Sequence, residues 1–139
     1  MSQENVEVVR RIYADPRGLT AAASDKVAPD AEFDFSAVYP DKPIVRGVDE
    51  LRRFRDSGPW GGSPIRFEPE RFFDVDDERV LVFVRVSATG HGSGAPVEIR
   101  AAHEVTIREG RLVRFKVYDN RDRALEAVGL SKQDTHADS

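Results

Sequence analysis

The sequence predicts an α+β fold: a curved, mixed or antiparallel sheet that forms a half-open cone on three N-terminal helices, with a short C-terminal helix. Three observations support this. Helical patterns come first in the chain, and long strand-like runs follow them. Short turns join these runs, which favours antiparallel pairing. The run 80–88 is apolar on both faces, which is typical of a strand covered on both sides. Long strands that cover helices curl, so one end of the cone should stay open as a cavity.

Two helices are expected at the N-terminus. Ser2 can cap the first, whose apolar side chains share one face up to Tyr13. Pro16 ends it, because the residue before a proline is pushed out of the helical region. A weaker, alanine-rich helix spans 19–27 and stops at the turn around Pro29.

A short strand and a third helix come next. The strand, 31–36, alternates so that its two phenylalanines face away from Asp34. The segment 37–47 contains two prolines and should be irregular. The third helix starts at Val48, with carboxylates in its first turn that suit the helix dipole, and stops at the loop 57–64.

Four strand-like runs follow, at 65–76, 80–88, 97–108 and 111–119. Pro69 interrupts the first, which predicts a bulge or an edge position. A hairpin turn at Glu109-Gly110 joins the last two. Asn120 opens the final helix, and Gly129 suits its C-terminal cap. We expect a single domain over 1–130 and a polar, disordered tail over 131–139.

Composition excludes several classes of function. The chain has 139 residues, a net charge of −4 and no cysteine, so disulfides and thiolate chemistry are excluded. The negative charge argues against nucleic acid as a partner. No apolar run is long enough for a membrane span, and the N-terminus does not read as a signal peptide. We therefore expect a cytoplasmic protein.

Asp119 is the first candidate for the functional site. It follows the alternating apolar residues of the last strand, so it could act as a general acid or base in an apolar pocket, where desolvation raises its pKa. The alternative is a carboxylate that caps the final helix. Asn120 can take the capping role instead, which leaves both interpretations open.

His103 lies alone on an apolar strand face and is the second catalytic candidate. It can titrate near neutral pH, or it can be a satisfied core histidine. The hairpin at Glu109-Gly110 should set it opposite Phe115 to Val117, a few residues from Asp119.

Three further positions are candidate ligand contacts. Arg85 interrupts an apolar strand face and needs an anion, either an acidic substrate group or an ion pair with Asp119 or Glu104. Tyr39 and Trp60 lie in loops at the expected rim of the cavity. They can stack on a flat ligand or plug the opening.

Tyr13 ends the apolar face of the first helix and can offer its hydroxyl to a ligand carbonyl, or it can be a core tyrosine with a wet tip. No cofactor or metal site is predicted. The three histidines lack ligand-like spacing, and the glycine-rich stretch 90–94 opens no helix.

Several stretches carry a resemblance to a known family. They are NVEVVRRIYAD, VRGVDELRRF, VLVFVRVSATGHGSG, AAHEVTIREGRLVRFKVY and RALEAVGL. In this order they resemble the SnoaL-like group of the nuclear transport factor 2-like superfamily, which also holds ketosteroid isomerases and limonene epoxide hydrolases. The resemblance covers nearly the whole chain and implies the cone fold. It does not specify a reaction, because the superfamily includes isomerases, cyclases, hydrolases and non-catalytic proteins.

The resemblance also bears on single residues. Members often carry aspartate at the position of Asn120, whereas this chain has its carboxylate at Asp119. The catalytic aspartate of ketosteroid isomerases corresponds to a position at or beside Phe35, which makes Phe35 a candidate ligand contact. Strand alternation should turn the neighbouring Asp34 away from the pocket. The tyrosine that ketosteroid isomerases use from their first helix supports Tyr13 as a donor.

Two functions follow as hypotheses. The first is a cofactor-free isomerase, cyclase or hydrolase that performs acid–base chemistry on a small hydrophobic, oxygenated molecule. The second is a non-catalytic module for small-ligand binding or dimerisation. Because one apolar face of the run 80–88 would line the cone, the other should be covered by a second subunit, which predicts a homodimer through the outer face of the sheet.

Overall fold

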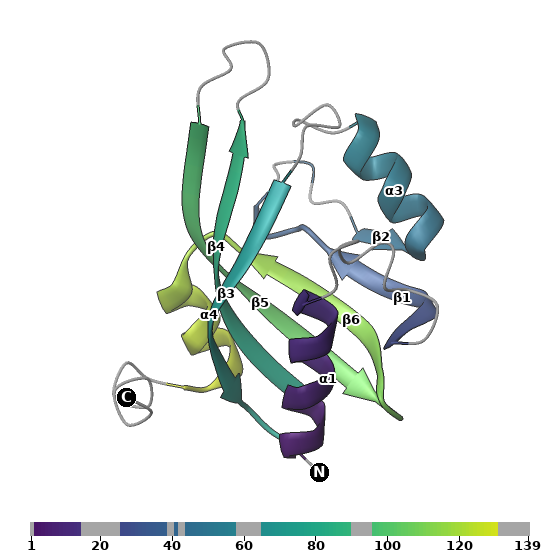
Figure 1. The fold of residues 1–139 in the computed structure, drawn as a ribbon, viewed down its shortest axis with the longest axis vertical. Helices are drawn as coiled ribbons and strands as arrows, with labels where there is room; N and C mark the ends of the chain where they lie inside the picture. Colours follow the sequence, from purple (N-terminus) through teal and green to yellow (C-terminus); the bar gives the residue numbers. More distant parts are fainter. Residues whose placement is uncertain are drawn as a thin grey trace.

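The computed structural model of the chain describes residues 2–14, 26–38, 41, 44–57, 65–89 and 96–130. In chain order its elements are α1 (Ser2–Ala14), β1 (Val27–Asp34), β2 (Ile44–Arg46), α3 (Val48–Ser57), β3 (Ile65–Asp74), β4 (Arg79–Thr89), β5 (Pro96–Arg108), β6 (Arg111–Tyr118) and α4 (Arg121–Val128). The six strands form one sheet in the order β2-β1-β6-β5-β4-β3 (Figure 1). β1 runs parallel to β6, and the other neighbours are antiparallel. The predicted α+β fold with a mixed, open sheet is confirmed.

Different helices cover the two faces of this sheet (Figure 1). On the α1 face, the buried side chains of the strands pack with α1 and α3; they include Phe33, Val80, Val82, Val84, Ala101, Val105 and Phe115. On the opposite α4 face, a second cluster packs with α4; it includes Phe73, Leu81, Phe83, Ala102 and Tyr118. β4 contributes alternate residues to both clusters, which confirms that this strand is covered on both sides.

α4 has the signals that the sequence predicts. Asn120 caps it, because its side-chain oxygen accepts a hydrogen bond from the Arg123 backbone N–H at 3.1 Å. Gly129 ends it with φ 80°, a conformation that glycine adopts without strain. Its apolar side, formed by Ala124, Leu125 and Val128, packs onto the sheet.

The cover that α4 provides corrects one step in the prediction of a homodimer. One apolar face of the run 80–88 was expected to need a second subunit, but α1 and α3 cover the face of Val80, Val82 and Val84, and α4 of the same chain covers Leu81 and Phe83. An apolar face with an internal partner no longer requires an external one. The homodimer itself stays a prediction.

The N-terminal part of the chain differs from the prediction at residues 44–46 and at Pro29. Residues 44–46 form the edge strand β2, whereas an irregular segment was expected; the prolines of this segment precede the strand and do not interrupt it. Pro29 lies inside β1 and not at a turn, because the pairing of β1 with β6 shifts register between Val27 and Glu32. Most of the expected helix 19–27, like the tail 131–139, lies outside the described residues.

Pro69 produces the predicted bulge, on the edge strand β3. The β3–β4 register shifts between Pro69 and Arg71, so Glu70 is the extra residue. Pro69 faces Val84 and has no N–H to give it. Instead, the Val84 carbonyl accepts a hydrogen bond from Arg121 Nη2 at 3.1 Å.

None of the helices among the described residues is long and apolar enough to cross a membrane.

Candidate functional site

Tyr13 and His103 form a hydrogen-bonded pair on the α1 face. Tyr13 comes from the last turn of α1, where it shares a side of the helix with the buried Val9, and His103 comes from the middle of β5. The Tyr13 hydroxyl lies within hydrogen-bond distance of His103 Nδ1. The two rings are nearly parallel, with centroids 5.9 Å apart. The structure therefore joins two residues that lie 90 positions apart in the chain.

Apolar and aromatic side chains surround this pair. His103 faces Val82 across β4 and Val117 across β6, which confirms the predicted position opposite Phe115 to Val117. The ring centroids of Phe115 and Phe67 lie 4.4 Å and 5.2 Å from that of His103. The imidazole is completely buried in this setting.

Burial keeps both members of the pair uncharged at neutral pH. Desolvation lowers the pKa of His103 from 6.5 to about 3. The same cause raises the pKa of Tyr13 well above its ordinary value. The second ring nitrogen of His103, Nε2, is buried and has no hydrogen-bond partner within the described part of the chain. The pair is a neutral polar centre with one nitrogen left unsatisfied.

An open apolar row lies on the same face, beyond the pair. Phe67, Val86 and Ile99 face one another across β3, β4 and β5. Phe67 is 41% exposed and Ile99 40% exposed, which is unusual for large apolar side chains. Phe67 also contacts the His103 ring edge to face, so the open row and the buried pair are adjacent.

Asp119 lies one residue past the end of β6, and its side chain is exposed. It does not cap the final helix, since Asn120 has that role. Val117, the strand partner of His103, lies two residues before it. The catalytic role of Asp119 stays a prediction.

Arg85 is separated from His103 by the sheet itself. It lies on the α4 face of β4 and pairs with Glu68 across β3, with an N–O distance of 3.0 Å. The predicted partners are wrong: Glu104 instead accepts a hydrogen bond from Tyr118 at 3.0 Å, and Asp119 is exposed. Arg85 and the Tyr13–His103 pair therefore do not share one site.

Of the remaining candidate ligand contacts, the structure describes Phe35 but not Tyr39 or Trp60. Phe35 packs on the α1 face and stacks on Phe54 of α3, with ring centroids 4.7 Å apart. Tyr39 and Trp60 lie outside the described residues. Asp34 is turned to the opposite face, as alternation predicts, where Arg114 donates to it at 3.0 Å.

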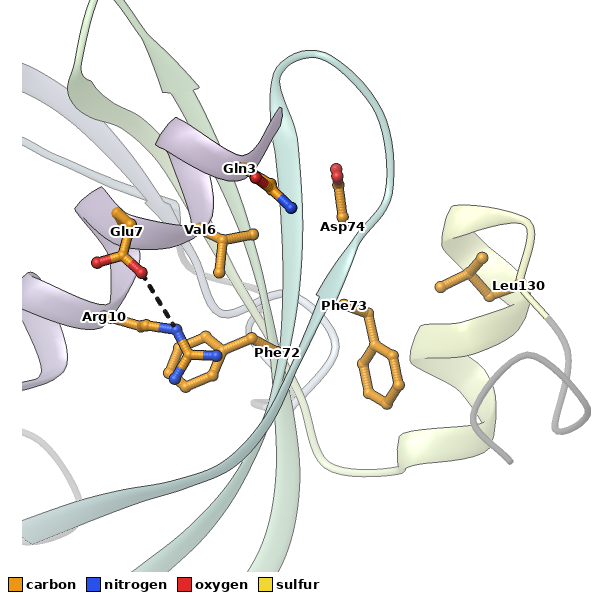
Figure 2. Close-up of a pocket in the computed structure, with 8 residues that line it drawn as sticks. All are labelled: Gln3, Val6, Glu7, Arg10, Phe72, Phe73, Asp74 and Leu130. Atoms are coloured by element: carbon orange, nitrogen blue, oxygen red, sulfur yellow. Dashed lines mark ion pairs between the residues drawn. The ribbon is translucent and has the colours of Figure 1, made fainter. Parts of the chain in front are cut away.

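A hollow of about 630 Å³ lies elsewhere, between α1, the end of β3 and Leu130, the second residue after α4 (Figure 2). It is lined by Gln3, Val6, Glu7, Arg10, Phe72, Phe73, Asp74 and Leu130. Among the described residues, none of the predicted site residues lines it. It is linked to the pair through Phe72, whose ring meets Tyr13 edge to face with centroids 6.1 Å apart. We place the candidate chemistry at the pair because the hollow holds no buried, unpartnered polar group.

Sequence reasoning missed Phe67. Strict alternation along β3 puts Phe67 and Phe72 on opposite faces, but both lie on the α1 face because the bulge at Glu70 shifts the period by one residue. Pro69 predicts a bulge, but the sequence does not show which residue of the strand is the extra one. Ile99, by contrast, was visible in the sequence on the same strand face as His103.

Comparisons with known proteins agree with this fold. A family model described as SnoaL-like domain matches residues 8–115. No curated protein sequence matches the chain. A structure from Jannaschia sp. CCS1, described as a candidate SnoaL-like polyketide cyclase, is 18% identical with a TM-score of 0.68 and covers 91% of this chain and 92% of its own.

Two further structures are similar. TerC, crystallised with polyporic acid, is 20% identical with a TM-score of 0.68, over 91% of this chain and 98% of its own. SalBIII, an epoxide hydrolase/cyclase-like enzyme of pyran ring formation in polyether salinomycin, is 20% identical with a TM-score of 0.69, over 86% and 95%. At these identities the likeness shows the fold.

Proposed function

Because this chain belongs to the SnoaL-like domain family, we propose that it binds a small hydrophobic, oxygenated molecule on the α1 face, with Tyr13 and His103 as the polar centre. The observation that carries this proposal is the buried Nε2 of His103, which has no partner among the described residues. Buried polar groups in native proteins are nearly always satisfied. A polar atom of a ligand supplies what the described chain does not.

The apolar body of the ligand lies along Phe67, Val86 and Ile99. Small-molecule sites are typically apolar surfaces with a few polar groups that fix orientation. This row offers such a surface, since two of its members are about two-fifths exposed and Phe67 touches the His103 ring. The co-crystal of TerC with polyporic acid supports a small-molecule role for this fold.

The binding test uses acetonaphthone, a flat aromatic ketone, titrated while backbone amides are followed by NMR. We expect the amides of Phe67, Val86 and Ile99 to shift. Ile99→Glu should weaken binding about tenfold or more, because it places a charge on the apolar row. Ile44→Glu is the matched control, since Ile44 is also an exposed isoleucine, 53% exposed, but lies on β2 at the far edge of the sheet. Equal loss in both variants, or shifts only at the β3 edge, contradicts the proposal.

A second candidate function is cofactor-free proton transfer on the same ligand, as in an isomerase, cyclase or hydrolase. The hydrogen-bonded Tyr13–His103 pair favours it, because neutral donors in an apolar setting stabilise negative charge that develops on oxygen. The descriptions of the Jannaschia protein and SalBIII add support. A base is still required, and Asp119 is the proposed one.

Deuterium uptake tests this candidate. In heavy water, removal of a proton from the methyl group of acetonaphthone gives an enolate, which returns to the ketone with deuterium in place of hydrogen. We expect the protein to accelerate this exchange and Asp119→Asn to abolish the acceleration without weakening binding. Intact binding without acceleration leaves ligand binding as the function.

A further inference from the structure

The tautomer of His103 can be deduced from its bond to Tyr13. The Tyr13 hydroxyl and His103 Nδ1 share one hydrogen bond, so one donates and the other accepts. A phenol hydroxyl is a more acidic donor than a neutral imidazole N–H, and an imidazole nitrogen is a more basic acceptor than a phenol oxygen. Tyr13 therefore donates to Nδ1. Burial keeps the imidazole neutral, so its single proton is on Nε2.

The Nε2–H group then lacks an acceptor in the described structure. Nε2 is buried and makes no hydrogen bond to any described residue. Apart from Tyr13, the side chains that the strand register and ring contacts place beside His103 are those of Val82, Val117, Phe67 and Phe115, which carry no oxygen or nitrogen. Aromatic rings accept hydrogen bonds only weakly. A strong donor is thus held where the acceptor has to be a water molecule, a residue outside the described ranges, or a ligand that displaces the exposed Phe67 ring from its contact with His103.

We propose that His103 acts as a neutral hydrogen-bond donor, fixed in its Nε2–H tautomer by Tyr13, and that it recognises an acceptor oxygen of the ligand: a carbonyl, ether or epoxide oxygen. This inference rests on the proposed function, because it names the ligand group that the same site selects. It also changes the role predicted for His103. A nitrogen that already carries a proton cannot serve as the base, so proton removal falls to another group.

In a reaction, this arrangement polarises a carbonyl without transferring the proton. Negative charge that develops on the ligand oxygen strengthens the bond from Nε2–H, while the Tyr13 hydroxyl holds Nδ1 and stops the ring from turning. Neutral imidazoles are known to act as electrophiles of this kind when their pKa is lowered. Tyr13 is a positioning residue in this scheme, and His103 is the residue that contacts the ligand.

The tautomer is tested without a ligand, by long-range proton–nitrogen correlation NMR of the protein with labelled histidine. His103→Gln assigns the signals. We expect the pattern of a protonated Nε2 and an unprotonated Nδ1 at neutral pH. Tyr13→Phe should move the signals toward a mixture of tautomers, whereas Tyr118→Phe, which removes the buried hydroxyl on the other face, should leave them unchanged. A protonated Nδ1 in the unaltered protein overturns the proposal.

The ligand preference is tested with a matched pair of probes. Acetonaphthone carries an acceptor oxygen, and ethylnaphthalene has a similar shape without one. We expect the ketone to bind about 5- to 100-fold more tightly, and His103→Phe to remove most of this difference. Equal binding of both probes to the unaltered protein refutes recognition of the oxygen. If neither probe binds on the α1 face, the proposed function fails, while the NMR result decides the tautomer independently.

Discussion

At the scale of single residues, the charge state of His103 governs the candidate site. Its imidazole is completely buried among aromatic rings, and burial lowers its pKa to about 3. Tyr13 also stays protonated, because burial raises its pKa. The pair is therefore joined by a hydrogen bond between neutral groups and not by an ion pair. Its chemistry is that of donors and acceptors, and it changes little across the physiological pH range.

Because His103 is uncharged in the folded chain, the free energy of unfolding depends on pH. In the unfolded chain His103 takes up a proton near pH 6.5, whereas in the folded chain it does so only near pH 3. Its contribution to stability is therefore complete above pH 6.5 and falls as the pH drops toward 3. The slope from this one residue is about 1.4 kcal/mol per pH unit. Urea unfolding between about pH 7 and pH 5 should show this slope.

His103→Met is the matched variant, because methionine fills the space and does not titrate. We expect its stability to fall less steeply than that of the unaltered chain over the same window. Carboxylates with a lowered pKa, such as Asp34 and Glu70, add their own slope only in stronger acid. Identical slopes for the two proteins would mean that the folded state protonates His103 as readily as the unfolded state does.

At the scale of elements, Arg121 links α4 to the bulged edge of the sheet. Its guanidinium donates to the carbonyls of Val84 and Ala101 and pairs with Glu70, the extra residue of the bulge. Its Cζ also lies 4.7 Å from the centroid of the Phe83 ring. The Arg121 side chain thus donates to the Val84 carbonyl, to which Pro69 has no N–H to donate, and it anchors the N-terminus of α4.

Removing this link should cost stability. We expect Arg121→Met to lower the free energy of unfolding by about 2–4 kcal/mol, because it leaves buried carbonyls and a carboxylate without a donor. Arg121→Lys should lose less of the free energy of unfolding than Arg121→Met but more than none, since lysine cannot reach several acceptors with one planar group. The control is Arg123→Met, an exposed arginine on the same helix. Equivalent urea unfolding curves for Arg121→Met and Arg123→Met would contradict this role.

Elements were largely predictable from sequence because their signals are local. Alternation in β4, the Glu109-Gly110 turn and the caps at Asn120 and Gly129 each depend on a few neighbouring residues, and each is confirmed. β2 escaped prediction because a strand of three residues gains its order from pairing with β1, which no local pattern reveals. A turn was wrongly predicted at Pro29 for the same reason: the register shift that accommodates this proline within β1 depends on the pairing with β6.

The site was less predictable than the fold. His103 and Tyr13 were both singled out, yet nothing local in the chain indicates that they meet, because 90 positions separate them. Arg85 was placed correctly on the face of Leu81 and Phe83, but assigning that face to the ligand required knowing that α4 covers it. Which face of a sheet serves a ligand is a property of the tertiary structure.

At the scale of the whole molecule, the two faces of the sheet differ in polarity. Within the described chain, the α1 face is apolar around the Tyr13–His103 pair. The α4 face carries charged clusters beside its apolar centre. Arg114 pairs with both Glu32 and Asp34, and Glu104 binds Tyr118. This division agrees with the ligand that we propose for the α1 face and with the partner that we predict on the other face.

The homodimer remains a prediction, and α4 restricts where its contact can lie. α4 covers the apolar centre formed by Phe73, Leu81, Phe83, Ala102 and Tyr118, so a two-fold contact on this face has to use β1 and the part of β6 that precedes Tyr118. Lys116 lies half-buried on that part of β6. In sedimentation velocity we expect the unaltered chain to have the mass of two chains, and Lys116→Glu to shift it toward one, because the cation that acts on Asp34 is replaced by a carboxylate and negative charge then gathers at the contact.

Arg66→Glu is the control for this experiment, because it makes the same change of charge on the exposed, opposite edge strand β3. It should sediment like the unaltered chain. An unaltered chain with the mass of one chain would refute the dimer. A dimer that both substitutions leave intact would move the contact away from β1 and β6, and the open row of Phe67, Val86 and Ile99 would then be the apolar surface left to form it.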